Sequence, residues 1–556
     1  MCVFDPLLQD WEMQMPCQIR RLDSGSIVQQ QVEHAMAKSK VTGLADWAQD
    51  ACARVKKSPQ VAPTVLVVVL AWELGVLFFD ASKKLFWYDE LLTLHVSSLQ
   101  PFSLFWRALR AGVDGMPLGY YLVVRAVRML PGDPHVILRL PSILGYLMTL
   151  LGVYWFARKR LPAIAGLAAV LLITLSPFRD YAIEARSYSL LVGLLAISAV
   201  LWQRIGEKRF MAPLFVLFLT LAVSSHQLAV VVISAFGVAE LTWIFLSRRI
   251  RWWVWIACLF ATSPFFLSLP ILLHYREVFG KNFWARPSWF EAIRTYGFYL
   301  GINPKLALVL IAFFGIVASQ SLLRMIRKPG GEGSPVGRDF EPHEIILFSG
   351  FLYFPAILVV LTVFLHSGYH ARYGWPGILG LVLGAVYLVR SIWFKSHSTY
   401  LLMALLIGFA CQGGIDLMNL HKAGSGRADE RWTSLAELSR SEPDIPVVIG
   451  SPIAYLEATE YSPPELRSRL VEVVDADNAT RLIGADTADK TDLLLAQFIP
   501  LRVEDLAAFQ VAHQKFILRS GGADDWFTLY LVEKGYHLSL LSKDSGPGSS
   551  IYIAER

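Results

Sequence analysis

Charged side chains are scarce in this sequence, because only 17% of its 556 residues are Asp, Glu, Lys or Arg, whereas 54% are hydrophobic. A soluble protein of this length would not be so apolar, so the composition excludes an ordinary water-soluble fold. Runs of roughly 18 to 23 apolar residues recur between Val61 and Met418, and each is long enough to cross a bilayer as a helix. The chain is therefore predicted to be a multi-pass membrane protein.

Cysteine is also rare, with five residues in the whole chain. Cys2, Cys17 and Cys52 precede the first apolar run, while Cys258 and Cys411 lie within later ones. None falls in a segment predicted to lie on the outer face of the membrane, and no CxxC pair is present. The sequence therefore excludes a disulfide framework and a cysteine metal site, and helix packing must hold the structure together.

No cleavable signal peptide is expected either, because the first 60 residues lack its basic, apolar and small-residue pattern. Residues 1–60 are predicted to be a cytoplasmic segment, so that the first span targets the chain. Hydropathy and helix-breaking residues predict about eleven spans within a transmembrane region of residues 61–418. They lie near residues 61–79, 138–156, 163–177, 187–202, 210–223, 228–245, 252–273, 305–323, 345–365, 374–389 and 400–418.

Basic residues cluster in alternate short loops, although the net charge is only +6. This distribution indicates orientation in a bilayer and not binding to nucleic acid, and it makes those loops cytoplasmic. An odd number of spans then places the tail, residues 419–556, on the outer face together with Asp89 and Glu90. The clusters are Arg54, Lys56 and Lys57; Arg158, Lys159 and Arg160; Lys208 and Arg209; Arg248, Arg249 and Arg251; Arg324, Arg327 and Lys328; Arg390 and Lys395.

The first outer loop, Asp80 to Ile137, is unusually long. Within it, residues 102–111 and 118–130 mix aromatic and apolar side chains with arginines, which predicts helices lying in the membrane interface. Ordinary surface helices are the alternative interpretation of the same pattern.

The tail changes character and is predicted to form a small extracytoplasmic α/β domain. Strands are expected at residues 445–449, 470–474 and 493–496, and a helix at residues 463–470. The turn Gly450-Ser451-Pro452 after the first of these strands is reminiscent of nucleotide-binding folds. No GxGxxG follows it, so we expect no cofactor site in this domain.

Polar residues at the outer ends of the predicted spans form the candidate functional site. Charges persist beside hydrocarbon only when they are paired or wetted, so such a belt is a functional candidate by default. An acid pair that follows a span is otherwise an ordinary solvated loop feature. The belt comprises Asp89, Glu90, Asp114, Arg139, Glu184, Arg186, His226, His366, His370 and Arg372.

Two other polar features have competing interpretations. His366 and His370, four residues apart, could share a helix face and bind a metal, but two exposed histidines at a helix start are the simpler interpretation. Glu73 lies inside the first predicted span, where an isolated charge is costly. We expect it to face the helical bundle or a wet cavity and to pair with a buried cation.

Several short motifs, taken in order, resemble the GT-C superfamily of membrane glycosyltransferases over residues 61–418. The superfamily resemblance rests on Trp87-Tyr88-Asp89-Glu90, Met116-Pro117-Leu118-Gly119-Tyr120-Tyr121 and Leu138-Arg139-Leu140-Pro141-Ser142. Further motifs resemble the bacterial branch related to protein O-mannosyltransferases and to the aminoarabinose transferase of lipid A. These are Ser176-Pro177, Glu184-Ala185-Arg186-Ser187-Tyr188-Ser189, Ser225-His226-Gln227 and Ala371-Arg372-Tyr373 with Pro376.

The chain departs from that branch at two positions. Met116 stands where the family often has the first of two prolines, and Gln227 replaces the aromatic residue after the motif histidine. Both departures affect the expected substrate geometry more than the reaction class.

The resemblance implies a GT-C fold and inverting transfer of a hexosyl or pentosyl sugar from a polyprenyl phosphate. The acceptor would be a lipid, glycan or protein of the cell envelope, reached on the periplasmic face of a bacterial cytoplasmic (inner) membrane. The resemblance implies no cofactor beyond the lipid-linked donor, and it leaves a divalent metal open. Nucleic acid is not an expected partner.

The resemblance and the chemistry together assign roles to individual residues. Asp89 is the expected general base for the acceptor, with Glu90 orienting the acceptor or supporting a cation. Arg186 and Arg372, then Arg139, are expected to bind the donor phosphate, because guanidinium groups match phosphate oxygens. The expected acceptor-binding or supporting residues are Glu184, which could hold Arg186, together with His226, Tyr120, Tyr121 and Tyr373.

Two other function classes fit the composition. A transporter or flippase for a lipid-linked sugar or small solute would place ionisable residues near the bilayer midplane and often show paired repeats, which this sequence lacks. A scaffold with an outer binding domain would not need about eleven spans. The order of the motifs favours the enzyme.

Overall fold

The computed structural model describes residues 60–208, 210–280, 282–327, 341–365, 367–392, 397–422, 430–522, 524–543 and 549–556. The predicted cytoplasmic segment, residues 1–60, lies outside these residues except for its last position, and His366 lies outside them too.

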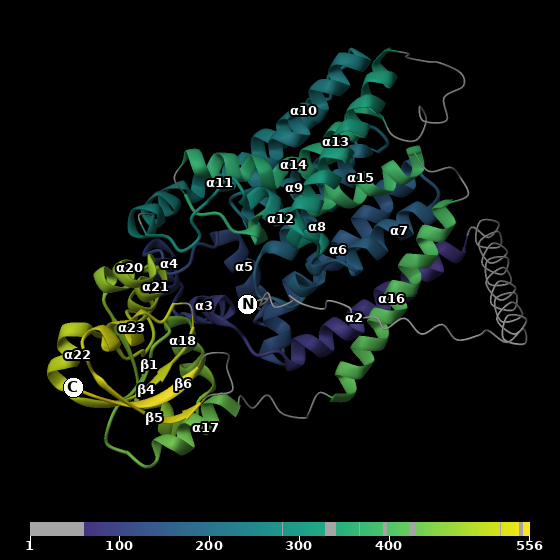
Figure 1. Ribbon diagram of the computed structural model, residues 1–556. Coiled ribbons are helices and arrows are strands. Elements are labelled where there is room, and N and C mark those ends of the chain that lie inside the picture. The colour runs from purple at the N-terminus through teal and green to yellow at the C-terminus, as the bar shows by residue number, and fades with distance from the viewer. Residues whose placement is uncertain are drawn as a thin grey trace, which may run out of the picture. The chain divides into compact units, whose positions relative to one another are not determined.

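A helical bundle forms the apolar part of the chain (Figure 1). Each predicted span coincides with a helix or with a bent pair of helices. The bundle consists of α2 (Val61–Lys83), α6 (Pro134–Arg160), α7 (Ala163–Thr174), η1 (Pro177–Ile183), α8 (Tyr188–Gln203), α9 (Met211–Ser225), α10 (Ala229–Ser247), α11 (Trp252–Phe279), α12 (Glu291–Leu300), α13 (Pro304–Arg327), α14 (Pro342–Phe364), η2 (Ala371–Gly374), α15 (Gly377–Ile392) and α16 (His397–Lys422).

Six of the described helices are long and apolar enough to cross a membrane, or up to eight if two bent pairs each form one span. The pair α7 and η1 bends by 70°, and α12 with the start of α13 bends by 90°. Helices α8, α9 and α15 are apolar but shorter. The prediction of a multi-pass helical membrane protein is confirmed.

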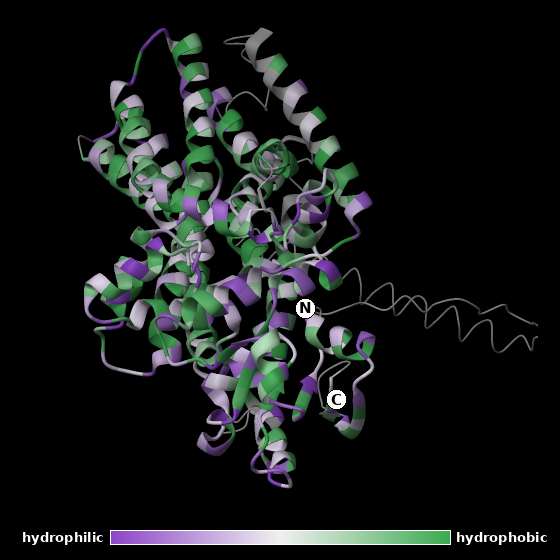
Figure 2. Cartoon of the chain, turned by 90° about the vertical axis from the view of Figure 1, so that its left-hand side faces the viewer, coloured by the Kyte–Doolittle hydropathy of each residue, from purple (hydrophilic) through white to green (hydrophobic). Residues whose placement is uncertain are grey.

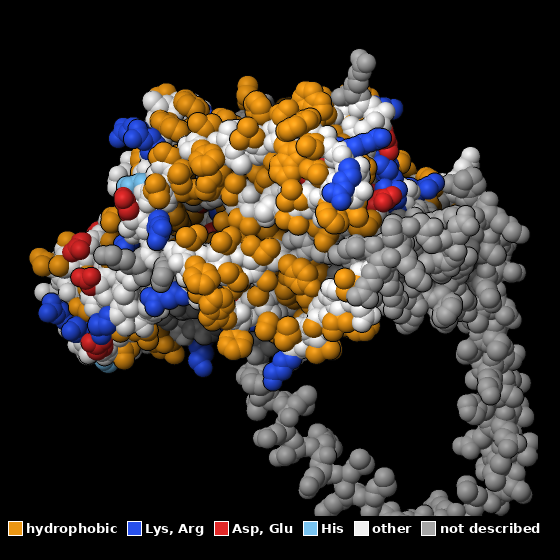
Figure 3. Space-filling view, turned by 90° about the horizontal axis from the view of Figure 1, so that it is seen from above, with side chains coloured by type: hydrophobic (Ala, Val, Ile, Leu, Met, Phe, Trp, Pro, Cys, Tyr) orange, Lys and Arg blue, Asp and Glu red, His pale blue; other side chains and the backbone are white. Residues whose placement is uncertain are grey.

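The outer surface of the bundle is apolar, as lipid requires. Leu259 and Leu267 of α11, for example, are 71% and 80% exposed. Hydrophobic residues predominate along the helices in Figure 2. In Figure 3, hydrophobic side chains cover most of the helical surface in view, while Lys and Arg gather towards its margins.

A buried ion cluster ties the first span to the last. Arg179 of η1 donates to Glu73 of α2 at 2.9 Å and to both carboxylate oxygens of Asp416 of α16 at 3.2 and 2.8 Å. Tyr146 of α6 also donates to Glu73. The prediction that Glu73 faces the bundle and pairs with a cation is confirmed, because lipid would otherwise leave this charge without a partner.

Three helices lie between α2 and α6 and form the long loop that follows the first span. They are α3 (Tyr88–Ser98), α4 (Phe102–Arg110) and α5 (Leu118–Val127). The last two coincide with the helices predicted there, and each buries one apolar side, such as Phe105 and Leu109 of α4.

The tail folds as a six-stranded sheet in the order β3-β2-β1-β4-β6-β5, with helices around it. Strands β1 to β4 pair in parallel, and β6 runs antiparallel to both β4 and β5. The strands are β1 (Val447–Ile449), β2 (Leu470–Val474), β3 (Val503–Asp505), β4 (Lys515–Ser520), β5 (His537–Lys543) and β6 (Ser550–Glu555). The helices are α17 (Glu430–Ser439), α18 (Pro452–Tyr461), α19 (Pro464–Arg467), α20 (Ala476–Ile483), α21 (Thr487–Leu495), α22 (Leu506–Ala512) and α23 (Trp526–Glu533).

The predicted α/β domain is present, and one of its predicted strands is wrong. Residues 493–496 end helix α21, because a short apolar run such as Leu493 to Leu495 fits a buried helix as well as a strand. The predicted helix at 463–470 shortens to the single turn of α19, and β2 occupies its end.

The turn after β1 holds a carboxylate of the chain itself. Asp524 accepts hydrogen bonds from the Ser451 hydroxyl at 2.8 Å and from the Ile453 amide at 3.2 Å, at the N-terminus of α18. The N-terminus of α18, where a nucleotide-binding fold would bind an anion, therefore holds the Asp524 carboxylate.

Helices α6 and α8 approach closely at glycines. A Cβ on Gly193 of α8 would lie 2.1 Å from the carbonyl oxygen of Gly145 of α6. We expect Gly193→Ala to push the two helices apart and to lower the melting temperature of the purified protein by several degrees.

Gly237→Ala in α10 is the matched control, since no atom lies within 4 Å of its added Cβ. That variant should melt at or slightly above the wild-type temperature, because Ala favours a helix over Gly by about 1 kcal/mol. Equal melting of both variants would contradict the close approach of α6 and α8.

Candidate active site

Asp89 and Glu90 lie in the first turn of α3 and point in different directions. The Glu90 side chain is fully buried, whereas the Asp89 side chain is 14% exposed. Adjacent residues on a helix are about 100° apart around its axis, so one acid can face the protein interior while the other faces a site. The two acids consequently have separate functions.

Glu90 and Arg139 form a buried bidentate ion pair. Arg139 donates from Nε to Oε1 and from Nη2 to Oε2 of Glu90, both at 2.8 Å. Its remaining N–H groups donate to the carbonyl of Ala81 in the last turn of α2 and to those of Lys84 and Leu85 just after it. The pair therefore joins α2, α3 and α6.

Arg139 is thus not available to a donor phosphate, which corrects the sequence prediction. All five N–H groups of its guanidinium are used, and its side chain is 0% exposed. Glu90 also accepts a hydrogen bond from the Ala185 amide at 2.6 Å. Of the two roles predicted for Glu90, the structure supports the positioning of a cation and not contact with an acceptor.

Asp89 is contacted by both arginines that the sequence analysis placed first. Arg372 Nη1 lies 2.8 Å from Asp89 Oδ2, and Arg186 Nε lies 3.9 Å from the same oxygen. Residues from α3, the loop before α8 and η2 are thereby brought together, although almost 300 positions separate the first from the last. The predicted convergence of Asp89, Arg186 and Arg372 is observed.

The charge of Asp89 is stabilised by these two cations. Burial raises the pKa of the Asp89 carboxyl, but Arg372 first and Arg186 second outweigh burial, and the resulting pKa lies below the ordinary value. Asp89 is therefore ionised at neutral pH and is a weak base while both cations remain beside it.

Arg186 is held mainly by Asp114 of the outer loop. Its Nη1 and Nη2 donate to the two Asp114 oxygens at 2.9 and 3.2 Å, and Nη1 also donates to the Asp89 carbonyl at 3.0 Å. Tyr121 donates to Asp114 at 2.6 Å. The suggestion that Glu184 holds Arg186 is wrong, because Asp114 takes that position.

Arg372 is surrounded by aromatic rings. Its guanidinium carbon lies 5.5 to 5.9 Å from the ring centroids of Trp87, Tyr188, Trp284 and Tyr373, within cation–π range. Its Nε is buried and has no hydrogen-bond partner. Arg372 has a free Nε, as Arg186 does, but within the described residues it forms no ion pair other than the one with Asp89.

His226 is a neutral hydrogen-bond donor at this centre. Burial, followed by the charges of Arg186 and Arg372, lowers the pKa of His226 to about 3. Its Nδ1 accepts a hydrogen bond from the Leu228 amide at 3.3 Å, which assigns the ring proton to Nε2. That nitrogen is buried without a partner, as are the hydroxyls of Tyr120 and Tyr188. Buried donors of this kind are normally satisfied, so they are available to a ligand.

Glu184 lies at the edge of the same cluster, 3.9 Å from Lys84. Burial raises its pKa to about 7, against the opposing effect of Lys84 and with a further contribution from Glu90. One of its carboxylate oxygens is buried and unpartnered. Glu184 is therefore partly protonated at neutral pH and can donate or accept a proton.

The C-terminal domain packs directly against α3. The Tyr88 hydroxyl donates to Asp492 at 2.9 Å, and the Tyr461 hydroxyl accepts from the Phe86 amide at 2.7 Å. Tyr88, the residue before Asp89, is thus anchored to the C-terminal domain, and this contact couples the position of that domain to the site.

Metal ligands are not grouped within the described part of the chain. No set of three or more His, Cys, Asp or Glu side chains there could hold an ion.

The helical bundle, the loop helices α3 to α5 and the α/β domain after the last span together form a fold that solved membrane proteins share. The chain superposes on the crystal structure of ArnT from Cupriavidus metallidurans bound to undecaprenyl phosphate with a TM-score of 0.51 and 14% sequence identity, over 89% of this chain and 98% of that one. An oligosaccharyltransferase from Archaeoglobus fulgidus gives a TM-score of 0.46 at 10% identity, over 88% of this chain and 73% of that one. The sequence matches no protein-family model and no curated protein. Similarity at 14% identity establishes the fold, and it confirms the predicted resemblance to GT-C proteins.

Several residues of the site were missed by the sequence analysis. Asp114 belongs to the polar belt, but nothing in the sequence indicates that it is the main partner of Arg186. Tyr188 and Trp87 lie within the quoted motifs, and Trp284 lies in none. Only their spatial convergence on Arg372 reveals them, because aromatic residues are common throughout a membrane sequence.

Replacing Arg139 tests the positioning pair. Arg139→Met leaves Glu90 buried without its cation, and breaking such a pair costs about 3 to 5 kcal/mol. We expect a marked drop in melting temperature in detergent. Arg158→Met, at an exposed position, should change stability by about 0.5 kcal/mol or less. A wild-type melting temperature for Arg139→Met would contradict the structural role.

The raised pKa of Glu184 predicts a titration near neutral pH. A protonated carboxyl infrared band should decrease as the pH rises through about 7. The band should be smaller in the difference spectrum of Glu184→Gln but not absent, because burial also raises the pKa of Asp489 to about 7. An unchanged band in that variant would assign the titration to another carboxyl group.

Proposed function

We propose that this protein is a membrane glycosyltransferase that transfers a sugar from a polyprenyl phosphate to an acceptor on the periplasmic face of the cytoplasmic membrane. One observation carries the proposal: the ionised, partly exposed Asp89 is paired with Arg372 at 2.8 Å and flanked by Arg186, in a chain with the GT-C fold. ArnT, which shares the fold, is solved with undecaprenyl phosphate, and this supports a lipid phosphate as the donor carrier.

In this mechanism Asp89 removes the proton from the acceptor hydroxyl or amine. The acceptor atom attacks the anomeric carbon, and the bond from that carbon to the phosphate oxygen breaks with inversion. The electron pair stays on the departing lipid phosphate. Arginine stabilises this developing charge well, because its planar group matches the phosphate oxygens.

Arg372 would connect the two halves of the reaction. Burial alone would raise the pKa of the Asp89 carboxyl, but the ion pair with Arg372 keeps that pKa low. When a donor phosphate attracts the same guanidinium, Asp89 loses its counterion and becomes a stronger base. Donor binding would thereby activate the base before the acceptor reacts.

The unpartnered donors around Arg372 would hold the donor headgroup. His226 Nε2 and the Tyr188 hydroxyl lack partners in the described structure and flank Tyr373 in ring contact. Tyr120 and Glu184 would support the acceptor. The identities of sugar and acceptor within the bacterial envelope belong to the proposal too, as does the periplasmic orientation of the site.

Asp89→Asn tests this function most simply. Because the amide is isosteric but cannot take the proton, we expect sugar transfer to fall by about 100-fold or more while the protein still folds. The readout is mass spectrometry of envelope lipids and proteins from cells that carry either form of the gene, scored for the mass of one sugar residue.

Asp477→Asn, at an exposed position in α20, provides the control and should retain full transfer. Full transfer by Asp89→Asn, with the expected mass product present, would refute the assignment of the base.

A further inference from the structure

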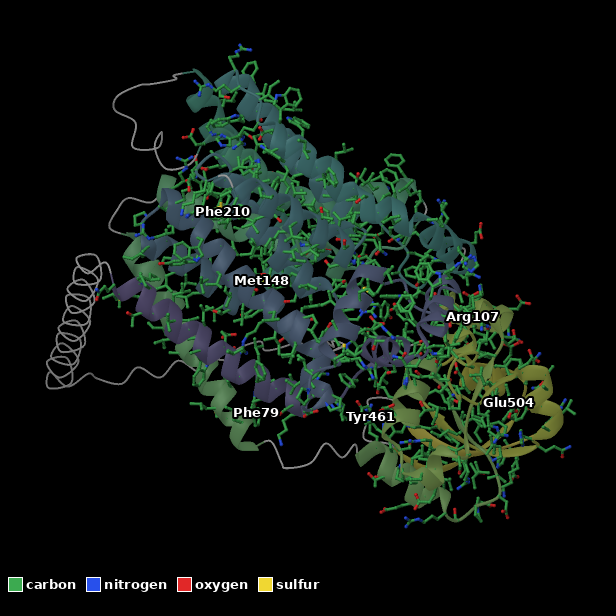
Figure 4. The ribbon with its side chains drawn as sticks, turned by 180° about the vertical axis from the view of Figure 1, so that it is seen from behind. Phe79, Arg107, Met148, Phe210, Tyr461 and Glu504 are labelled. Carbon is green, nitrogen blue, oxygen red and sulfur yellow. The ribbon has the colours of Figure 1, made fainter. Side chains whose placement is uncertain are left out.

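An open cleft lies where α4, α11 and the C-terminal domain meet. Its volume is about 490 Å³. Arg107 and Arg110 of α4, His274 of α11 and Phe498 of the outer domain line it. Figure 4 labels Arg107 at this junction. None of the residues around Asp89 lines this cleft, so it is separate from the candidate active site.

The cleft carries positive charge that the protein does not neutralise. Arg107 and Arg110 are exposed, and neither has an ion pair or side-chain hydrogen bond in the described ranges. Its lining contains no acidic residue. The nearest counterion to His274 is Glu277 at 3.7 Å, whose side chain is 79% exposed. Two unpaired guanidinium groups that face one cleft favour an anion, and phosphate in particular.

The cleft also has an apolar side that continues along α11. Trp106, Ile271 and Phe498 line it beside the arginines. Further along the same helix, Leu259 and Leu267 are among the most exposed hydrophobic residues of the bundle. A ligand that fits both features has an anionic head and a hydrocarbon tail.

The depth of the cleft along α11 agrees with such a ligand. Helix α11 begins at Trp252, directly after the basic cluster Arg248–Arg251. Pro270 and His274 lie 18 and 22 residues further on, which corresponds to about 27 and 33 Å of helix. This is close to the thickness of the hydrocarbon core. The cleft therefore lies at the level of the opposite lipid headgroups.

We propose that this cleft binds the phosphate headgroup of a membrane lipid, whose hydrocarbon chain lies along the exposed face of α11. Arg107 and Arg110 bind the phosphate oxygens. A smaller cavity of about 10 Å³ shares Ile271 with the cleft and is lined by Met116 and Gln227. Ser187, the neighbour of Arg186, donates to the Met116 sulfur at 3.3 Å. The bound lipid would thus lie beside the candidate active site, although its binding does not depend on sugar transfer.

Photolabelling of the full-length protein in dodecyl maltoside tests the proposal. The probe is a decyl phosphate with a diazirine near the head, and labelled peptides are identified by mass spectrometry. We expect labelling within residues 102–111 and 267–279. Arg107→Gln with Arg110→Gln should reduce it by about tenfold or more, since charge-assisted contacts of at least 1.4 kcal/mol would be lost.

Arg158→Gln with Arg249→Gln removes the same charge from exposed positions elsewhere and should leave labelling unchanged. Asp89→Asn should also label normally, so that failure of sugar transfer and failure of lipid binding can be told apart. Size-exclusion profiles check that each variant is folded.

Three results would overturn the proposal. The first is undiminished labelling in the Arg107 and Arg110 double variant. The second is equal labelling by the corresponding decyl alcohol, which would show a site for hydrocarbon alone. The third is full competition by equimolar inorganic phosphate, which would show a site for a soluble anion.

Discussion

The ion pair between Glu90 and Arg139 is the constraint on which the active centre depends. It is completely buried, every N–H of the guanidinium is used, and it joins the end of α2 and the start of α3 to α6. With Glu90 fixed in this way, Asp89 is turned toward Arg372 and Arg186. A buried pair contributes little net stability, so its value lies in setting the direction of one helix turn.

The electrostatics around Asp89 follow from that orientation. Two arginines approach one carboxylate, and each differs in what else it contacts. Arg186 is fixed by Asp114, whereas Arg372 pairs with Asp89 and is surrounded by the rings of Trp87, Tyr188, Trp284 and Tyr373. Aromatic faces stabilise a cation without competing hydrogen bonds, so Arg372 can exchange Asp89 for another anion at low cost. The site has one rigid cation and one that is free to change partners.

The sequence predicted the class of fold and most of the residues that converge, because membrane spans and motif order are local signals. It could not predict which of those residues are satisfied by one another. In the sequence, Arg139 is a charge at the start of a span, which is also where a phosphate ligand would lie. Its hydrogen bonds to Glu90 and to the carbonyls at the end of α2 become visible only in the structure. Asp114 lacks a motif, and its partner lies 72 positions away. The strand predicted at residues 493–496 is a helix end, because three consecutive leucines show no hydrophobic periodicity that distinguishes a helix from a strand.

When the donor binds, Arg372 is expected to transfer its contact from Asp89 to the lipid phosphate. A structure of the full chain with a polyprenyl phosphate bound tests it most directly. We expect a phosphate oxygen within hydrogen-bond distance of Arg372 and a distance between Arg372 and Asp89 that is longer than the present 2.8 Å. The ion pair between Glu90 and Arg139 should stay intact. A phosphate bound away from Arg372, with the contact to Asp89 unchanged, would contradict it.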